Sequence, residues 1–197
     1  MPLIKLNNRS IKDVTSLPFG VGNLIHIQSQ TASNSASISF TGINGTYKEY
    51  QFYFIDIHAR TDNAFFQFNL STDSGSNYNV TKTSTYFVAM HDETDSPALL
   101  EYATSYDLAQ STGSQYLAQG MGSGADECLA GSFILFNPSS TTYVKHFICN
   151  TANYQTDNRS NNNFIAGYGN TTSAINAVQF NMSSGNMDGT IAMFGVL

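Results

Sequence analysis

The stretch YQFYFIDIHA, residues 50–59, decides the fold that we expect for this chain. Successive side chains of a β-strand point to opposite faces of the sheet. The apolar residues of this stretch occupy both faces, Tyr50, Phe52 and Phe54 on one and Tyr53, Ile55 and Ile57 on the other. A strand of this kind is covered on both sides. We therefore expect a second sheet on one side and a loop or a neighbouring subunit on the other.

Short runs with strand character follow one another on both sides of this stretch, separated by residues that favour turns. The expected strands are 24–29, 36–40, 64–70, 83–90, 128–136, 142–149, 163–169, 177–182 and 189–196. Residues 128–136 and 142–149 should pair as a hairpin about the turn NPSSTT, and the long segment 91–127 should form a helical turn or an excursion. The pattern predicts an all-β fold, an antiparallel β-sandwich of jelly-roll type, built by residues 21–197 as one domain.

The segment STDSGSNY, residues 71–78, lies between two expected strands and contains residues that favour a turn. Asp73 can bond the backbone through its side chain, and Gly75 can adopt a positive φ. Tyr78 can fold back to cap the core. We therefore predict that this segment is the structural tip of a hairpin.

Residues 1–20, MPLIKLNNRSIKDVTSLPFG, differ from the rest of the chain. They carry the basic residues Lys5, Arg9 and Lys12, and their apolar residues follow no long period. One interpretation is an arm that docks on a neighbouring subunit. The other is a first edge strand followed by a loop.

The composition limits the classes of partner. Charged residues make up 11% of the chain, against about 25% in a typical globular protein, and the net charge is −6. The eight Lys and Arg residues form no basic stripe, so binding to nucleic acid is not expected. No apolar run reaches the ~18–20 residues of a membrane span, and the N-terminus lacks a secretory signal. We expect synthesis in the cytoplasm of the producing cell.

The two cysteines, Cys128 and Cys149, flank the expected hairpin turn. The hairpin would bring them within a residue or two of facing each other across the strands. A cross-strand disulfide is one outcome, and two buried thiols are the other, which cytosolic synthesis favours.

No arrangement of residues indicates catalysis, a metal centre or a cofactor. The segment His91-Asp92-Glu93-Thr94-Asp95 has oxygen ligands for a hard cation, but it lacks the spacing of a calcium loop and is better explained as a solvated loop. Asp56 and His58 lie two residues apart on one face, yet no nucleophile motif accompanies them. We expect no enzyme activity, no metal and no cofactor.

A saccharide site is the one binding function that the composition favours. Aromatic faces and amide groups are the surfaces that sugars prefer, and the chain has 11 Tyr residues and many Asn residues. One segment, NTANYQTDNRSNNN, reads as a polar loop and combines Tyr154, Asn158, Arg159 and Asn161. These four residues are the candidate contacts with a glycan or a host surface, and a merely soluble loop is the alternative.

Four segments carry a family resemblance: MPLIKLNNRSIKDVTSLP, FQFNLSTDSGSNY, LFNPSSTTYVKHFI and GYGNTTSAINAVQFNMSSGNMDGTIAMFGVL. They are similar to small structural proteins of tailed bacteriophages, especially phages of marine bacteria and cyanobacteria, and the resemblance covers nearly the whole chain. The ending also resembles the terminal strand of phage fibre and spike domains. The family marks no catalytic residue.

This resemblance implies a non-enzymatic virion protein. The first hypothesis is a fibre, spike or tail-tip module that attaches through residues 1–20, forms a homotrimer and presents loops to the host surface. The second is a capsid decoration protein on the head lattice, and the third is a free lectin or carbohydrate-active enzyme. The expected partners are other virion proteins, from the portal and tail or the major capsid protein, and the expected location is the virion.

Overall fold

The computed structural model describes residues 24–96 and 98–197, which form twelve strands. The predicted arm at residues 1–20 lies outside the described residues. The strands are β1 (Leu24–Ser35), β2 (Ser37–Thr41), β3 (Glu49–Ala59), β4 (Ala64–Ser71), β5 (Lys82–Asp92), β6 (Ala98–Tyr102), β7 (Gln115–Met121), β8 (Leu129–Phe136), β9 (Lys145–Gln155), β10 (Arg159–Gly169), β11 (Ala177–Met182) and β12 (Met187–Val196). All pairings among them are antiparallel, and residues 24–96 and 98–197 contain no helix. The all-β prediction is confirmed.

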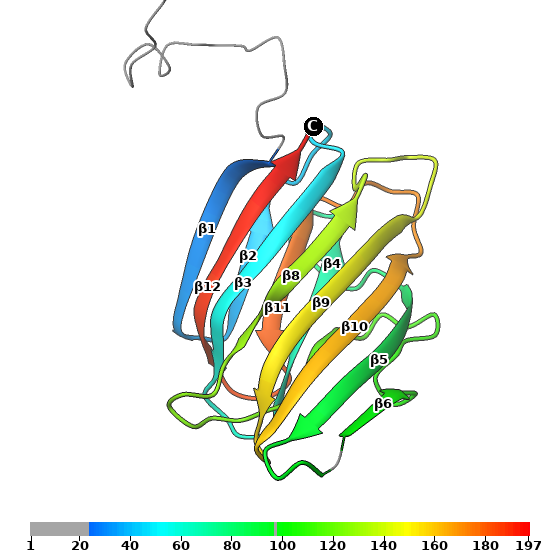
Figure 1. Cartoon of the computed structure of the whole chain (residues 1–197). Coiled ribbons are helices and arrows are strands. Elements are labelled where there is room, and N and C mark those ends of the chain that lie inside the picture. The colour runs from blue at the N-terminus through cyan, green and yellow to red at the C-terminus, as the bar shows by residue number, and fades with distance from the viewer. Residues whose placement is uncertain (1–23, 97) are drawn as a thin grey trace, which may run out of the picture.

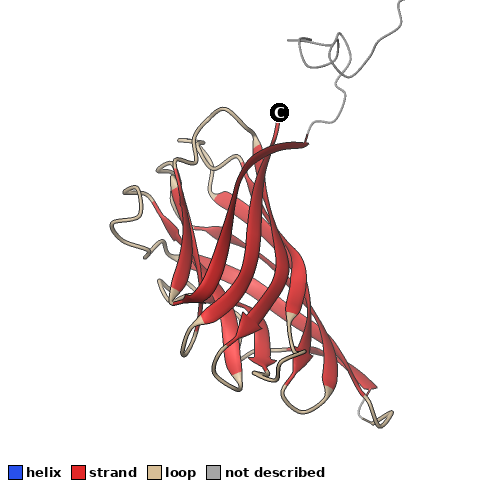
Figure 2. Ribbon diagram, turned by 90° about the vertical axis from the view of Figure 1, so that its left-hand side faces the viewer, coloured by secondary structure: helices blue, strands red, loops and turns tan. Residues whose placement is uncertain are grey.

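The strands form two layers (Figures 1 and 2). The large sheet has the order β1-β12-β3-β8-β9-β10-β5-β6, and the small sheet behind it has the order β2-β11-β4-β7. Without β5, β6, β9 and β10, the remaining eight strands can be renumbered along the chain. Their two sheets then read 1-8-3-6 and 2-7-4-5, which is the strand order of a jelly roll. The other four strands widen the large sheet at one side.

A cluster of phenylalanines fills the space between the two sheets. Phe180 on β11 is fully buried, and its ring centroid lies between 5.2 and 6.4 Å from six other aromatic rings. These rings belong to Phe40, Phe52, Phe54, Phe66, Phe68 and Phe133, on strands of both sheets. Because buried aromatic pairs favour such tilted and edge-on contacts, this cluster holds the two layers together.

One part of the expected pattern in β3 is wrong. Tyr53 and Ile55 point away from the second sheet, but Ile57 is fully buried and points towards it. The pairing with β8 shifts register between Phe54 and Ile57, and Asp56 within this bulge has a φ of 51°. A bulge inserts one extra residue and reverses the alternation beyond it.

Besides packing face to face, the two sheets also meet along one edge, at a seam between β7 and β9. The backbones pair there only at Met121 and Gln155. Elsewhere along the seam, the Thr151 hydroxyl donates a hydrogen bond to the Leu117 carbonyl (2.5 Å), and the Asn153 amide donates to the Gln119 carbonyl (3.2 Å). Side chains of β9 therefore satisfy backbone groups along the free edge of β7, and the sandwich is nearly closed on this side.

Candidate functional site

Three of the four predicted contact residues gather at the turn between β9 and β10. The Tyr154 hydroxyl lies 3.0 Å from Glu93 Oε1 and 3.1 Å from the side-chain oxygen of Asn158. The Arg159 guanidinium is 3.1 Å from the Asp157 carboxylate. The bond to Glu93 raises the pKa of the Tyr154 phenol. This polar tip ties the turn to the end of β5.

Asn161 does not belong to this surface. Its side chain is fully buried, donates to Gln155 Oε1 at 2.7 Å and keeps a buried oxygen without a partner among the described residues. The predicted polar loop is in fact the end of β9, a short turn and the start of β10. The prediction that Asn161 contacts a ligand at the surface is therefore wrong for this conformation.

The segment 71–78 forms a turn, as expected, but it is not a hairpin tip. β4 pairs with β7 and β11, while β5 pairs with β10 and β6, so the segment connects one sheet to the other. Asp73 accepts hydrogen bonds from Ser71 Oγ and from both the backbone and the side chain of Asn77, and these bonds lower its pKa to about 2. Gly75 has a φ of +88°, and an added Cβ would lie 2.8 Å from the Tyr78 hydroxyl oxygen.

The two cysteines are free and lie on opposite faces of the β8–β9 hairpin, which is present as predicted. Cys149 pairs in register with Phe133 and is buried, which raises the pKa of its thiol. Cys128 lies opposite Tyr154, whose backbone N–H donates to the Cys128 carbonyl. The expectation that the two cysteines nearly face each other is wrong, and no disulfide joins them.

The other titratable candidates do not form a centre. His91 Nε2 lies 3.0 Å from Asp95 Oδ1, and His58 Nδ1 lies 2.7 Å from the Glu127 carbonyl oxygen. Within residues 24–96 and 98–197, no group of three or more His, Cys, Asp or Glu side chains is arranged to hold a metal ion.

Two lysines, Lys82 at the start of β5 and Lys145 at the start of β9, are buried. Both are paired in register with Gly169 at the end of β10, which lies between these strands. Lys82 Nζ donates to Asn69 Oδ1 (2.5 Å) and the Val80 carbonyl (2.8 Å), and burial lowers its pKa to about 7. Lys145 Nζ donates to the carbonyls of Tyr143 and Thr171, and burial lowers its pKa as well. No carboxylate of the described chain lies within 4.0 Å of either ammonium group.

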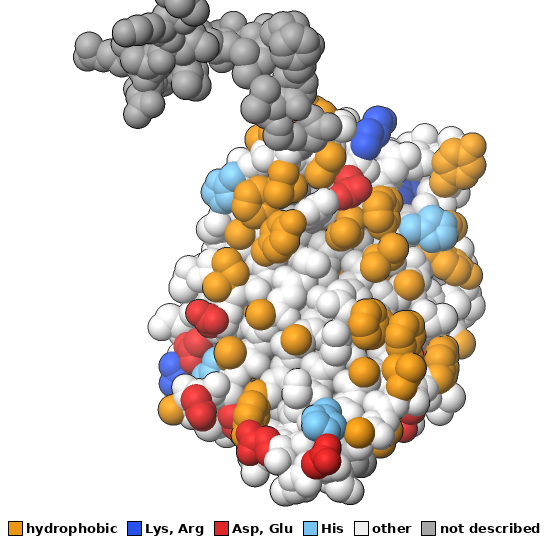
Figure 3. All heavy atoms as spheres, viewed as in Figure 1, with side chains coloured by type: hydrophobic (Ala, Val, Ile, Leu, Met, Phe, Trp, Pro, Cys, Tyr) orange, Lys and Arg blue, Asp and Glu red, His pale blue; other side chains and the backbone are white. Residues whose placement is uncertain are grey.

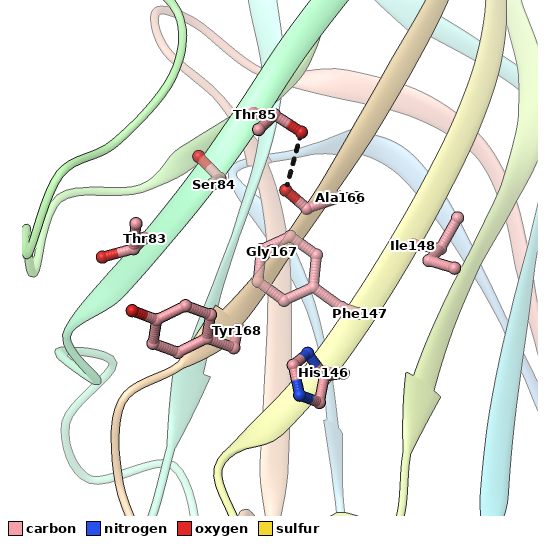
Figure 4. A pocket seen from close by; sticks show the side chains of 9 residues that line it. All are labelled: Thr83, Ser84, Thr85, His146, Phe147, Ile148, Ala166, Gly167 and Tyr168. Carbon is pink, nitrogen blue, oxygen red and sulfur yellow. Dashed lines mark hydrogen bonds between the residues drawn. The ribbon is translucent and has the colours of Figure 1, made fainter.

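The outward side of β8, β9, β10 and β5, here called the outer face, holds a feature that the sequence did not reveal. A hollow of about 440 Å³ lies above Ala166 on β10 (Figure 4). Its outward-facing lining is Thr83, Thr85, His146, Ile148, Ala166 and Tyr168. The Thr85 hydroxyl donates to the Ala166 carbonyl, and the Thr83 hydroxyl accepts hydrogen bonds from Gln110, so both hydroxyls are used within the chain.

A pair of stacked rings stands beside this hollow. Phe87 on β5 and Phe164 on β10 have ring centroids 4.9 Å apart and an interplanar angle of 9°. Phe87 is 40% exposed to solvent, and Ile148, which lines the hollow, is 50% exposed. The segments TYVKHFIC and NFIAGYG have apolar residues on both faces, as 50–59 does, and this signal would have identified the outer face.

Charge is distributed unevenly over the domain. Residues 24–197 carry five of the eight Lys and Arg and thirteen of the fourteen Asp and Glu, a net charge of −8. The outward positions of β5, β8, β9 and β10 nevertheless contain no Lys, Arg, Asp or Glu. Figure 3 shows hydrophobic side chains gathered over this side of the large sheet and again over β1, β12 and β3, with acidic side chains mostly towards the lower end.

The chain was also compared with known proteins. No protein-family model, no curated protein and no solved structure matches it. In the described part of the chain, no helix is long and apolar enough to cross a membrane.

Proposed function

We propose that this chain is a non-enzymatic structural protein of a bacteriophage particle. In this proposal it is a fibre, spike or tail-tip module that attaches through residues 1–20, assembles as a homotrimer and presents loops to the host surface. It is made in the host cytoplasm and resides in the virion, where its partners are the portal and tail proteins or the major capsid protein.

The observation that carries the proposal is the outer face of the large sheet. Ile148 and Phe87 are 50% and 40% exposed there, and the outward positions of four adjacent strands bear no Lys, Arg, Asp or Glu. Large exposed apolar patches mark interaction sites, and an uncharged face on a domain of net charge −8 suits permanent assembly. The jelly-roll order supports this reading, since capsid and lectin domains use the same architecture, although a fold alone does not decide a function.

The polar tip is the proposed host contact. Tyr154, Asn158 and Arg159 lie together at the turn between β9 and β10. An aromatic ring beside amide and guanidinium groups has the chemistry to bind a saccharide. Its hydrogen bonds to Glu93 and Asp157 already hold it in one arrangement, which reduces the entropy lost on binding.

Incorporation into particles tests the proposal. The chain and a variant without residues 1–20 are expressed during infection, and purified particles are quantified for both proteins. The full chain should be present at a few trimers per particle, whereas the shortened chain should fold and stay out. Hundreds of copies per particle would favour a capsid decoration protein. Absence of the full chain from particles, or hydrolysis of host polysaccharide by the purified chain, would overturn the proposal.

A further inference from the structure

We propose that the outer face binds the outer face of another copy of this chain, and that the stacked Phe87 and Phe164 rings of one copy enter the hollow above Ala166 of the next. This inference rests on the proposed function for the assembly of copies and adds to it a two-fold contact between outer faces, which is separate from the contacts within the homotrimer. It can be tested on the purified chain, without particles.

The face offers both halves of a contact. Phe164 and Ala166 lie two residues apart on β10, which places the stacked rings about 7 Å along the strand from the centre of the hollow. A surface that carries a projection and a matching recess side by side is complementary to itself, and self-complementary patches are what symmetric oligomers use.

The area is sufficient for a stable contact. The adjacent strands β8, β9, β10 and β5 have 8 to 11 residues each. With strands about 4.8 Å apart and a rise of about 3.4 Å per residue, their outward surface measures roughly 670 Å². This lies within the roughly 600–1,000 Å² that each partner buries in a standard interface.

Charge also favours a second copy. Two copies of residues 24–197, each of net charge −8, repel each other except where their contacting surfaces are uncharged, and like charges across an interface are strongly unfavourable. A basic partner would instead bind the acidic end of the domain, where Asp92, Glu93 and Asp157 lie. A glycan would find a mostly apolar surface in the hollow.

The test compares the mass in solution of the wild type and three variants at about 10 µM, by light scattering and native mass spectrometry. Because a face that binds the same face of another copy forms a two-fold contact, the wild type should contain an even number of chains, at least two, of 21.5 kDa each. Ile148→Lys places a charge at the rim of the hollow and should weaken association by about 30-fold or more, as expected for a central contact. Ile27→Lys, on β1 at the opposite edge of the sheet and 38% exposed, is the matched control and should remain associated.

A third variant separates a fitted contact from general hydrophobicity. Ala166→Phe makes the face more apolar but fills the hollow from within, so it should also weaken association by about tenfold or more. Circular dichroism checks that each variant is folded. A monomeric wild type, an unchanged mass for Ile148→Lys, or stronger association of Ala166→Phe would overturn the inference. A wild-type oligomer that behaves as expected but never joins particles would overturn the proposed function alone.

Discussion

Lys82 should make the stability of this protein depend on pH in a way that one substitution removes. Its side chain is fully buried, its ammonium group donates to the Asn69 side-chain oxygen and the Val80 carbonyl oxygen, and burial lowers its pKa from 10.5 to about 7. Between pH 7 and 10.5 the unfolded chain therefore binds more protons than the folded chain. The free energy of unfolding consequently rises with pH across this window, because the folded state favours the neutral amine.

The magnitude follows from the two pKa values. Each pKa unit corresponds to about 1.4 kcal/mol, so the lowered pKa costs roughly 4 kcal/mol of stability at pH 7 and about 2 kcal/mol at pH 9. The wild type should thus gain about 2 kcal/mol from this residue between pH 7 and 9. Lys82→Met keeps the length of the side chain without its charge. Relative to the wild type, its free energy of unfolding should fall by about 2 kcal/mol between pH 7 and 9.

Urea unfolding at a series of pH values measures this difference. The chain has no Trp, so far-UV circular dichroism or tyrosine fluorescence is the signal. Burial raises the pKa of Cys149, which opposes the trend at high pH, but this contribution cancels when the variant is subtracted from the wild type. Lys48→Met removes an exposed lysine and is the matched control. If Lys82→Met and the wild type had parallel pH profiles, a neutral buried amine at Lys82 would be refuted.

Three further predictions concern the turn, the strand packing and the tip. Asp73→Ala should lower the midpoint of thermal unfolding, and because the folded pKa is about 2, its difference from the wild type should vanish as the pH falls from 4 towards 2; a constant difference would contradict this. Gly167→Ala should cost about 1–3 kcal/mol in urea unfolding, since the added Cβ would lie 2.7 Å from Phe147 Cζ and 2.5 Å from a backbone oxygen; unchanged stability would disprove the clash. On a glycan array, Tyr154→Ala should abolish binding and Tyr143→Ala, at a separate exposed tyrosine, should not; equal effects would exclude the tip.

Alternation of apolar side chains was sufficient to predict the sandwich and the β8–β9 hairpin. It could not predict the bulge at Asp56, because an extra residue in one strand leaves no mark in the local pattern. As a result, Ile57 was expected on the wrong face. The error is small in the sequence and large in space, since a shift of one residue moves a side chain through the sheet.

Turn chemistry at Asp73 and Gly75 was predicted correctly, whereas the hairpin was not. The same hydrogen bonds stabilise a reversal within one sheet and a crossing between two sheets. What distinguishes the two is the pairing partner, and β4 pairs with β11, more than one hundred residues further along the chain. Local sequence contains no information about that partner. The outer face could not be predicted for a related reason, because it combines residues from strands that are far apart in the sequence.

The misread segment 150–163 has a physical explanation in the seam between the sheets. Thr151 and Asn153 are typical of a loop, yet they face inwards because the free edge of β7 presents backbone carbonyls that need donors. Asn163 extends the network, donating to Thr151 Oγ1 and Asn153 Oδ1 and accepting from the Tyr86 hydroxyl. An apolar residue at Asn153 would leave the Gln119 carbonyl unpaired in the interior, at a cost of about 1–3 kcal/mol. Polar residues in a strand next to an unpaired edge therefore indicate a closing seam as readily as a loop, and the widened sheet, with its hollow and stacked rings, depends on that closure.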